Sequence, residues 1–136
     1  ALSLGAIGVQ MGTRFIATKE SDFHDLWKNK VVESTEMDSL VGISIFGPAR
    51  YLKNTVSVRL HELLKEGFEK GYNEGVMLET KGIFLSMEGG DPEWSIYFGG
   101  EVAGRIDSII SVEELLQGIE EQAEAIIRDL QLTLSR

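Results

Sequence analysis

Apolar residues recur every three or four positions near the carboxyl end of the chain, and this is the clearest pattern in the sequence. The stripe consists of Leu115, Leu116, Ile119, Ala123, Ile126, Ile127, Leu130 and Leu134. Such spacing places side chains on one face of an α-helix. Ser111 and Glu114 precede the stripe within S-V-E-E, the pattern of a capping box. The sequence therefore predicts a helix that begins after Ser111.

Two further segments have the spacing of amphipathic helices. One runs from Asp22 to about Glu33 behind a capping Ser21. Its apolar face contains Phe23, Leu26, Trp27 and Val31. The other runs from Val58 to Lys70. Its apolar positions are Leu60, Leu63, Leu64, Gly67 and Phe68. Both segments are predicted to bury one face against a common core.

Two short segments are predicted to be strands. Residues Ile7–Phe15 form an apolar run closed by a glycine-containing turn, which is typical of a buried strand. Residues Leu40–Phe46 alternate between larger apolar and small residues, as a half-buried strand does, and Gly47 and Pro48 are expected to end it. Residues 76–87 fit a strand or a helix equally well. Because predicted helices and strands alternate along the chain, the predicted fold class is α/β.

Composition narrows the choice of function. The chain has 136 residues, with 13 basic and 22 acidic side chains and a net charge of −9. This length fits one domain, and the charge argues against a nucleic-acid binder or a protein held on anionic lipid. The absence of cysteine excludes disulfides and thiolate metal sites. No apolar run reaches the ~20 residues of a membrane helix, and no signal peptide is recognisable, so a cytoplasmic location is expected.

The first residues suggest a piece of a longer protein. Residues 1–6 read A-L-S-L-G-A, without an initiator methionine or a helix N-cap. A short apolar stretch followed by Gly5 is typical of the last turn of a helix. We therefore expect the chain to continue a helix that begins upstream of Ala1.

Candidate chemistry concentrates at the end of the first predicted strand, in Gln10-Met11-Gly12-Thr13-Arg14. A glycine at this position lets a ligand approach the backbone closely. The amides that follow it and the Thr13 hydroxyl are groups that bind anions. A second interpretation is a tight turn that leaves the strand, with Arg14 paired to a structural carboxylate. The residue pattern alone leaves both interpretations open.

The remaining polar residues predict no metal site and no catalytic group. His24 lies beside Asp22 and Asp25, but side chains so placed on one helix do not converge on an ion. His61 is expected on a solvated helical face. The acidic side chains of residues 88–93 are expected in a solvated loop.

Several segments, in order along the chain, carry a resemblance to a known family. They are A-L-S-L-G-A-x-G-V-Q-M-G-T-R-F-x-A-T-K-E-S at residues 1–21, His24, G-P-A-R-Y-L-K-N at residues 47–54, G-G-E-V-A-G at residues 99–104 and S-V-E-E-L at residues 111–115. In this order they resemble the carboxyl-terminal part of the 2-nitropropane dioxygenase-like flavoproteins. That family includes nitronate monooxygenases and flavin-dependent enoyl-acyl carrier protein reductases. Q-M-G-T-R-F followed by K-E-S is the most specific part of the resemblance.

The resemblance implies the carboxyl-terminal fragment of an FMN-binding TIM (β/α)8 barrel. Residues 1–34 would supply the end of barrel helix 7, strand 8 and the helix that follows. Residues 35–110 would form an inserted or appended, mostly helical subdomain. Residues 111–136 would form a helix that packs back on the barrel. Since a whole barrel takes ~250 residues, most of it would lie upstream.

The resemblance also implies the site. Carried over position by position, Gln10, Met11, Gly12 and Thr13 would lie against the FMN phosphate. The family's catalytic histidine lies upstream of this segment, so no catalytic residue is expected in this chain, and the 136 residues alone are expected to be inactive. The sequence departs from the family at Glu101, where glutamine is frequent, and at Phe46 and Gly47, where an arginine often precedes the proline.

Three functions follow from the resemblance. The first is part of an FMN-dependent nitronate monooxygenase acting on a nitronate. The second is part of an enoyl-acyl carrier protein reductase, with an enoyl thioester as substrate and NAD(P)H as reductant. The third is a non-catalytic interaction module derived from the same family. In each case strand 8 alone would leave open edges, so we expect either the upstream part of the barrel or a homo-oligomer as partner.

Overall fold

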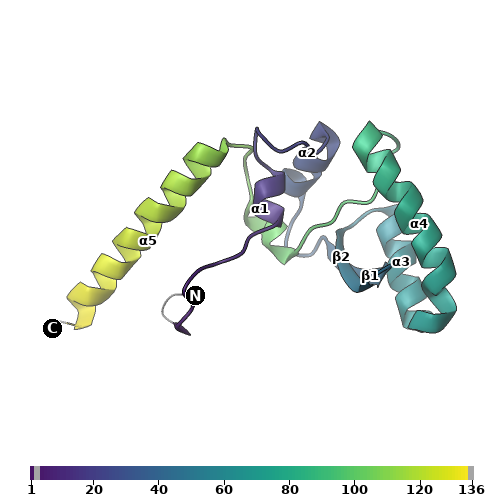
Figure 1. Ribbon diagram of the computed structural model, residues 1–136, viewed down its shortest axis with the longest axis horizontal. Helices are drawn as coiled ribbons and strands as arrows, with labels where there is room; N and C mark the ends of the chain where they lie inside the picture. Colours follow the sequence, from purple (N-terminus) through teal and green to yellow (C-terminus); the bar gives the residue numbers. More distant parts are fainter. Residues whose placement is uncertain (2–3, 135–136) are drawn as a thin grey trace.

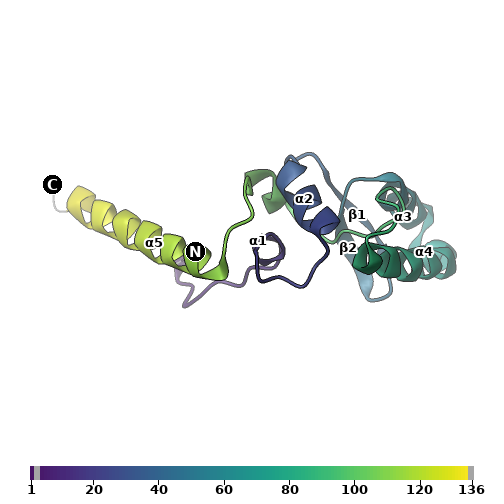
Figure 2. The same cartoon turned by 90° about the horizontal axis from the view of Figure 1, so that it is seen from above.

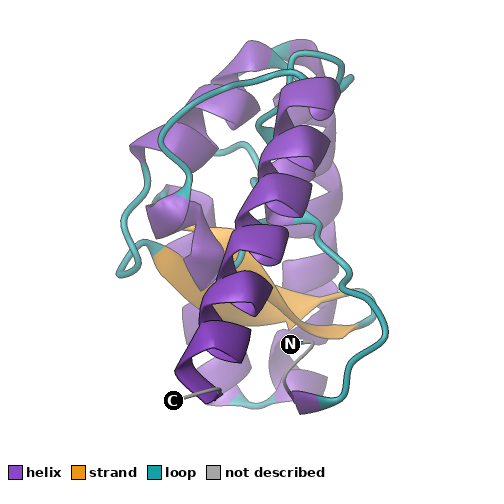
Figure 3. Ribbon diagram, turned by 90° about the vertical axis from the view of Figure 1, so that its left-hand side faces the viewer, coloured by secondary structure: helices purple, strands orange, loops and turns teal. Residues whose placement is uncertain are grey.

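The computed structural model describes residue 1 and residues 4–134. Helices dominate, and the one sheet among these residues has two strands (orange in Figure 3). In chain order the elements are α1 (Thr13–Ile16), α2 (Asp25–Glu33), β1 (Ser39–Ser44), β2 (Gly47–Leu52), α3 (Thr55–Glu66), α4 (Phe68–Glu88), the 3₁₀ helix η2 (Glu101–Arg105) and α5 (Val112–Leu134). Figure 1 shows α3 and α4 beside the strands at one end of the molecule and α5 at the other.

The middle part of the chain is built on an antiparallel hairpin. β1 pairs with β2 from Ser39 opposite Leu52 to Ser44 opposite Gly47, which leaves two residues in the connecting loop. Helices α3 and α4 pack on this hairpin at positions without side chains. A Cβ on Gly75 of α4 would overlap the Ile43 side chain. The core between these elements consists of Ile43, Tyr51, Val56, Leu60, Leu63 and Ile96.

A second core joins the first part of the chain to the hairpin. It consists of Ala17, Trp27, Val31, Leu52, Tyr97, Ala103 and Ile106. The Trp27 indole donates a hydrogen bond to the Phe98 carbonyl at 3.3 Å, and its ring lies 5.9 Å from that of Tyr97. Because Leu52 of β2 belongs to this core, α2 and the hairpin are held in a fixed relation.

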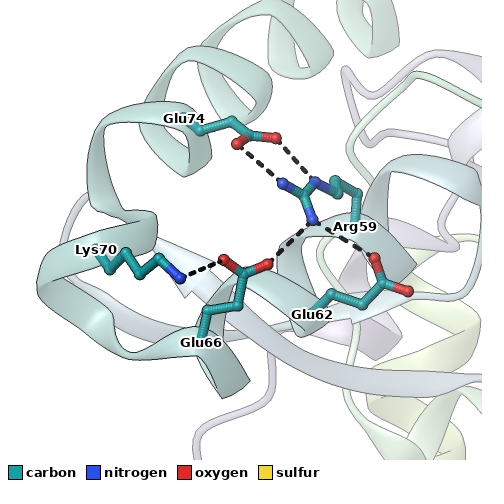
Figure 4. Close-up of polar contacts among 5 residues, drawn as sticks. All are labelled: Arg59, Glu62, Glu66, Lys70 and Glu74. Carbon is teal, nitrogen blue, oxygen red and sulfur yellow. Dashed lines mark hydrogen bonds and ion pairs between the residues drawn. The ribbon is translucent and has the colours of Figure 1, made fainter.

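The sequence predicted one helix over Val58–Lys70, but the structure divides this segment between two helices, α3 and α4. Gly67 separates them with a φ of +110°, a conformation that favours glycine. Arg59 then bridges the two helices (Figure 4), because its guanidinium binds both carboxylate oxygens of Glu74, at 2.8 and 2.9 Å. Glu62 and Glu66 lie 3.6 and 3.4 Å from the same group. The pair with Glu74 is exposed, so its contribution to stability is small.

Several predicted elements are confirmed with shifted ends. The strand expected over Leu40–Phe46 is β1. The ambiguous residues 76–87 are helical, within α4. The helix expected from Asp22 begins only at Asp25, and its cap is His24, whose Nδ1 accepts a hydrogen bond from the Leu26 amide. The first strand ends before Gly47 and Pro48, as expected, but these two residues also begin a second strand, β2, which the sequence did not predict. A two-stranded sheet has only edge strands, and proline is tolerated there.

The strand expected over Ile7–Phe15 does not form in this structure. Residues 7–11 have no regular structure, Ile7 and Val9 are exposed, and Thr13–Ile16 is helical. A strand needs neighbours for its backbone groups, and no strand among residues 4–134 lies next to this segment. The helix end expected over residues 1–6 includes Leu2 and Ser3, which lie outside the described residues.

Helix α5 begins as the sequence predicted. The Ser111 hydroxyl accepts a hydrogen bond from the Glu114 amide, and the Glu114 carboxylate accepts one from the Ser111 amide at 2.7 Å. In Figures 1 and 2 the helix extends away from the other elements. Leu115 is buried, but Ile126 and Leu130 are exposed, so the apolar stripe is largely uncovered. No helix among the described residues is long and apolar enough to cross a membrane.

Candidate functional site

The segment Gln10–Thr13 presents a row of free backbone donors. Within residue 1 and residues 4–134, none of the four amides donates a hydrogen bond to another part of the chain. A Cβ on Gly12 would meet nothing within 4 Å, so the backbone is open to solvent at this point. Unpaired, accessible N–H groups in sequence are what an oxyanion such as phosphate requires.

Thr13 links this segment to the later glycine-rich segment. The Gly100 amide donates a hydrogen bond to Thr13 Oγ1 at 3.1 Å. A hydroxyl that accepts in this way keeps its own hydrogen free to donate to a ligand. Beyond Gly100, the Glu101 carboxylate lies 2.9 Å from the guanidinium of Arg50. Sequence analysis placed both segments in one family pattern but gave no sign that Thr13 contacts Gly100.

Two charged side chains near Gly12, those of Glu20 and Arg14, form hydrogen bonds to other parts of the chain. An open cavity of about 490 Å³ contains Gly12 together with Glu20 and Asp22. The Glu20 carboxylate accepts a hydrogen bond from the Val112 amide at 2.9 Å. The Arg14 guanidinium donates to the Ser108 carbonyl at 2.9 Å and so holds the first helix to the last loop. Arg14 is therefore held by a carbonyl of the last loop, and the donors that Gln10–Thr13 present to solvent are backbone amides.

Thr18 and Lys19 hold the part of the chain that follows Gln10–Thr13 against the start of α5. Thr18 forms a parallel bridge with Ile110, and the Lys19 amide donates to the Ile110 carbonyl at 2.9 Å. Lys19 Nζ lies 3.3 Å from Glu114. Hydrogen bonds from Ser111, with a smaller effect of Lys19, lower the pKa of Glu114 to about 2.

The other polar residues singled out from the sequence have structural roles. No group of histidine or acidic side chains among the described residues is placed to hold a metal ion. His61 was expected to be solvated, which is wrong: it is half-buried, and its Nδ1 lies 2.6 Å from the Val41 carbonyl. Glu93 accepts hydrogen bonds from the Thr55 amide and hydroxyl at the start of α3, and these bonds lower its pKa.

Comparison with known proteins identifies the family. The model of the family described as nitronate monooxygenase matches residues 1–122. The chain belongs to the nitronate monooxygenase family. Probable nitronate monooxygenases of Staphylococcus saprophyticus and Staphylococcus haemolyticus are 29% and 30% identical to it, over 128 and 125 residues. These alignments cover 93% and 91% of this chain but only 35% and 34% of the two relatives.

Solved structures agree with this assignment. FabK from Thermotoga maritima matches 96% of the chain with a TM-score of 0.79 and 29% identity, and a mutant of the same protein matches with a TM-score of 0.75. The chain covers 41% and 38% of those two structures. The chain therefore spans little more than a third of the length of the family members it resembles, and Gln10–Thr13 lies within the matched part.

Proposed function

We propose that this chain is the carboxyl-terminal part of an FMN-dependent oxidoreductase of the nitronate monooxygenase type, and that Gln10–Thr13 supply part of its FMN phosphate site. The family match over residues 1–122 carries the proposal, because it includes this stretch. The unpaired amides of Gln10–Thr13 support it, since a bound phosphate would satisfy donors that otherwise face solvent.

FMN, when bound, supplies the redox chemistry. The residues of this chain would bind and orient it. The Gln10–Thr13 amides would donate to phosphate oxygens, and the absence of a side chain at Gly12 would let the phosphate approach the backbone. The Thr13 hydroxyl would donate as well, held in place by its bond from the Gly100 amide.

The rest of the barrel would also supply partners for two parts of the chain, the unpaired residues 7–11 and the exposed apolar stripe of α5. We infer that residues 7–11 become the eighth strand when neighbouring strands are present, since they are apolar and unpaired here. We infer likewise that the exposed stripe of α5 packs against the barrel. Residues 1–34, 35–110 and 111–136 would then be the barrel unit, the subdomain and the returning helix.

One alternative rests on a specific observation. The structural similarity to FabK, with a TM-score of 0.79, favours a flavin-dependent enoyl-acyl carrier protein reductase that acts on an enoyl thioester with NAD(P)H as reductant. A substrate comparison distinguishes the two: oxygen-dependent turnover of a nitronate supports the first activity, and oxidation of NAD(P)H that depends on an enoyl thioester supports the second.

The phosphate assignment is tested in the longer protein that we propose carries these residues. FMN affinity is measured by flavin fluorescence for the parent and for Gly12→Val, which places a branched side chain where the phosphate would lie. We expect FMN affinity to fall at least 100-fold. Gly118→Val is the matched control, because a Cβ at Gly118 on α5 also meets nothing within 4 Å.

A second pair of variants tests the hydroxyl. Thr13→Val removes it at nearly constant shape, and the loss of one hydrogen bond to a charged group predicts about tenfold weaker FMN binding. Thr13→Ser keeps the hydroxyl and should restore most of the affinity. Parent-like affinity in both Gly12→Val and Thr13→Val would refute the assignment.

A further inference from the structure

Two glycines, Gly99 and Gly100, connect the candidate phosphate segment to strand β2. The Gly99 amide donates a hydrogen bond to the Arg50 carbonyl of β2 at 3.2 Å. The next amide, that of Gly100, donates to Thr13 Oγ1 at 3.1 Å. A Cβ on Gly99 would overlap the Leu52 side chain, so this part of the chain lies tightly against β2. The position of the Thr13 hydroxyl therefore depends on how the two glycines are held.

The side chain of Arg50 holds the residues on both sides of Gly100. Its guanidinium lies 2.9 Å from the Glu101 carboxylate. The same guanidinium donates to Ser39 Oγ at 3.3 Å, and the Ser39 hydroxyl donates to the Gly99 carbonyl at 3.2 Å. One side chain thus fixes Gly99 through Ser39 and fixes Glu101 directly.

These contacts matter because the groups that they hold can otherwise rotate. Two successive glycines have wide backbone freedom, so the direction of the Gly100 N–H is not set by its own residue. Threonine in a helix adopts two side-chain rotamers, because its hydroxyl can also bond a carbonyl of the preceding turn. The bond from Gly100 selects one rotamer of Thr13, the first residue of α1. The contacts lead in order from Arg50 to Gly100 to Thr13.

We propose that Arg50 is a positioning residue for the Thr13 hydroxyl. By holding the residues on both sides of Gly100, its guanidinium keeps the Gly100 amide aimed at Thr13 Oγ1. The hydroxyl accepts this bond and has its own hydrogen available for a phosphate oxygen of FMN. This role rests on the proposed function of Gln10–Thr13. Because Arg50 acts through Thr13, its removal costs no more FMN affinity than removal of the Thr13 hydroxyl.

A double-mutant cycle in the longer protein tests this dependence. FMN affinity is measured by flavin fluorescence for the parent, Arg50→Met, Thr13→Val and the double variant. The side chains of Arg50 and Glu101 are 44% and 63% exposed, and exposed ion pairs contribute little, so we expect Arg50→Met to weaken FMN binding only about threefold. In the Thr13→Val background the same substitution should have no further effect, because the hydroxyl through which it acts is gone.

Three further variants separate positioning from a general effect of charge. Arg50→Lys keeps the charge but lacks the planar group that reaches Glu101 and Ser39 together, so it should restore only part of the affinity. Glu101→Gln breaks the ion pair from its other side and should weaken binding no more than Arg50→Met does. Arg59→Met is the matched control, because Arg59 is also a partly exposed arginine in an ion pair, on α3, and it should leave FMN affinity unchanged.

A measurement without FMN follows the same contacts directly. Hydrogen exchange of the peptide that contains Gly100, measured by mass spectrometry on the longer protein, should be faster in Arg50→Met than in the parent and unchanged in Arg59→Met. Unchanged exchange in Arg50→Met, parent-like FMN affinity in that variant, or an equal loss in both Thr13 backgrounds would overturn the positioning role. Parent-like affinity in Thr13→Val would instead count against the phosphate assignment itself, and the role of Arg50 would fall with it.

Discussion

A buried hydrogen-bond network holds the hairpin to α4, and removing one hydroxyl tests it. Tyr51 and Glu79 are both almost fully buried. The Tyr51 hydroxyl donates to Glu79 Oε1 at 2.8 Å, and the Ile43 carbonyl lies 2.9 Å from the Tyr51 hydroxyl oxygen. The Ile45 amide donates to Glu79 Oε2 at 2.9 Å. In Tyr51→Phe the carboxyl group stays buried but loses one of these two donors.

The expected size of this effect follows from the contact that is lost. A hydrogen bond to a charged group is worth about 1.5–3 kcal/mol, and a buried acceptor without a partner is costly. We therefore expect Tyr51→Phe to lower the free energy of unfolding by about 2 kcal/mol. The measurement is urea denaturation followed by far-ultraviolet circular dichroism.

Glu79→Gln is the matched control. The amide oxygen of Gln can accept from the Ile45 N–H while its nitrogen donates to the Tyr51 oxygen, which leaves the Tyr51 hydrogen for the Ile43 carbonyl. All groups then keep a partner, and the loss should be below about 1 kcal/mol. A loss under about 0.5 kcal/mol in Tyr51→Phe would show that the Tyr51 hydroxyl makes no strong hydrogen bond to the Glu79 carboxylate.

The same network predicts a dependence on pH. Burial, together with the bond to Glu79, raises the pKa of Tyr51 above its ordinary value of 10.0. The folded chain therefore holds this proton at pH values where the unfolded chain releases it, and stability falls as the pH rises above about 10. The fall in unfolding free energy with alkaline pH should be smaller in Tyr51→Phe, and an identical slope in both proteins would contradict the assignment.

Two further predictions concern the packing and the capping of helices. Gly75→Ala should lower the free energy of unfolding by about 1–3 kcal/mol, because the new methyl overlaps Ile43, whereas Gly118→Ala on the open face of α5 should not destabilise the chain; urea denaturation of both gives the comparison. Ser111→Ala removes the hydroxyl but keeps the amide of residue 111 and Lys19, so the pKa of Glu114 should rise only part of the way from about 2 toward its ordinary value. The loss of stability as pH falls through that range should then be smaller than in the parent. An unchanged pKa, measured by NMR titration of the side chain, would contradict the capping box.

Local signals in the sequence were enough for some elements. The capping box of Ser111 and Glu114 and the stripe behind it predicted the start of α5, because both depend only on residues close together in the chain. The alternation over Leu40–Phe46 likewise predicted β1. The partner strand was missed because Pro48 was taken as a strand end, although an edge strand tolerates a proline.

Features that depend on distant partners could not be read in the same way. The strand expected over Ile7–Phe15 has the right composition, but strand formation requires neighbours, and none lies beside it here. The bond between Gly100 and Thr13 joins residues far apart in the sequence, as do the bonds of Glu79 to the hairpin. The sequence indicated Gln10–Thr13 as the candidate phosphate-binding residues. The structure shows that the amides of these residues donate no hydrogen bond to the described part of the chain.

We propose that Gln10–Thr13 complete a flavin site to which the upstream part of the barrel also contributes. The most direct measurement is a flavin-fluorescence titration of FMN against the 136-residue chain and against the longer protein we propose contains it. We expect saturable binding by the longer protein, loss of that binding in Gly12→Val, and no saturable binding by the chain alone. Tight binding by the isolated chain, or none by the longer protein, would show that these residues do not share a flavin site with the rest of the barrel.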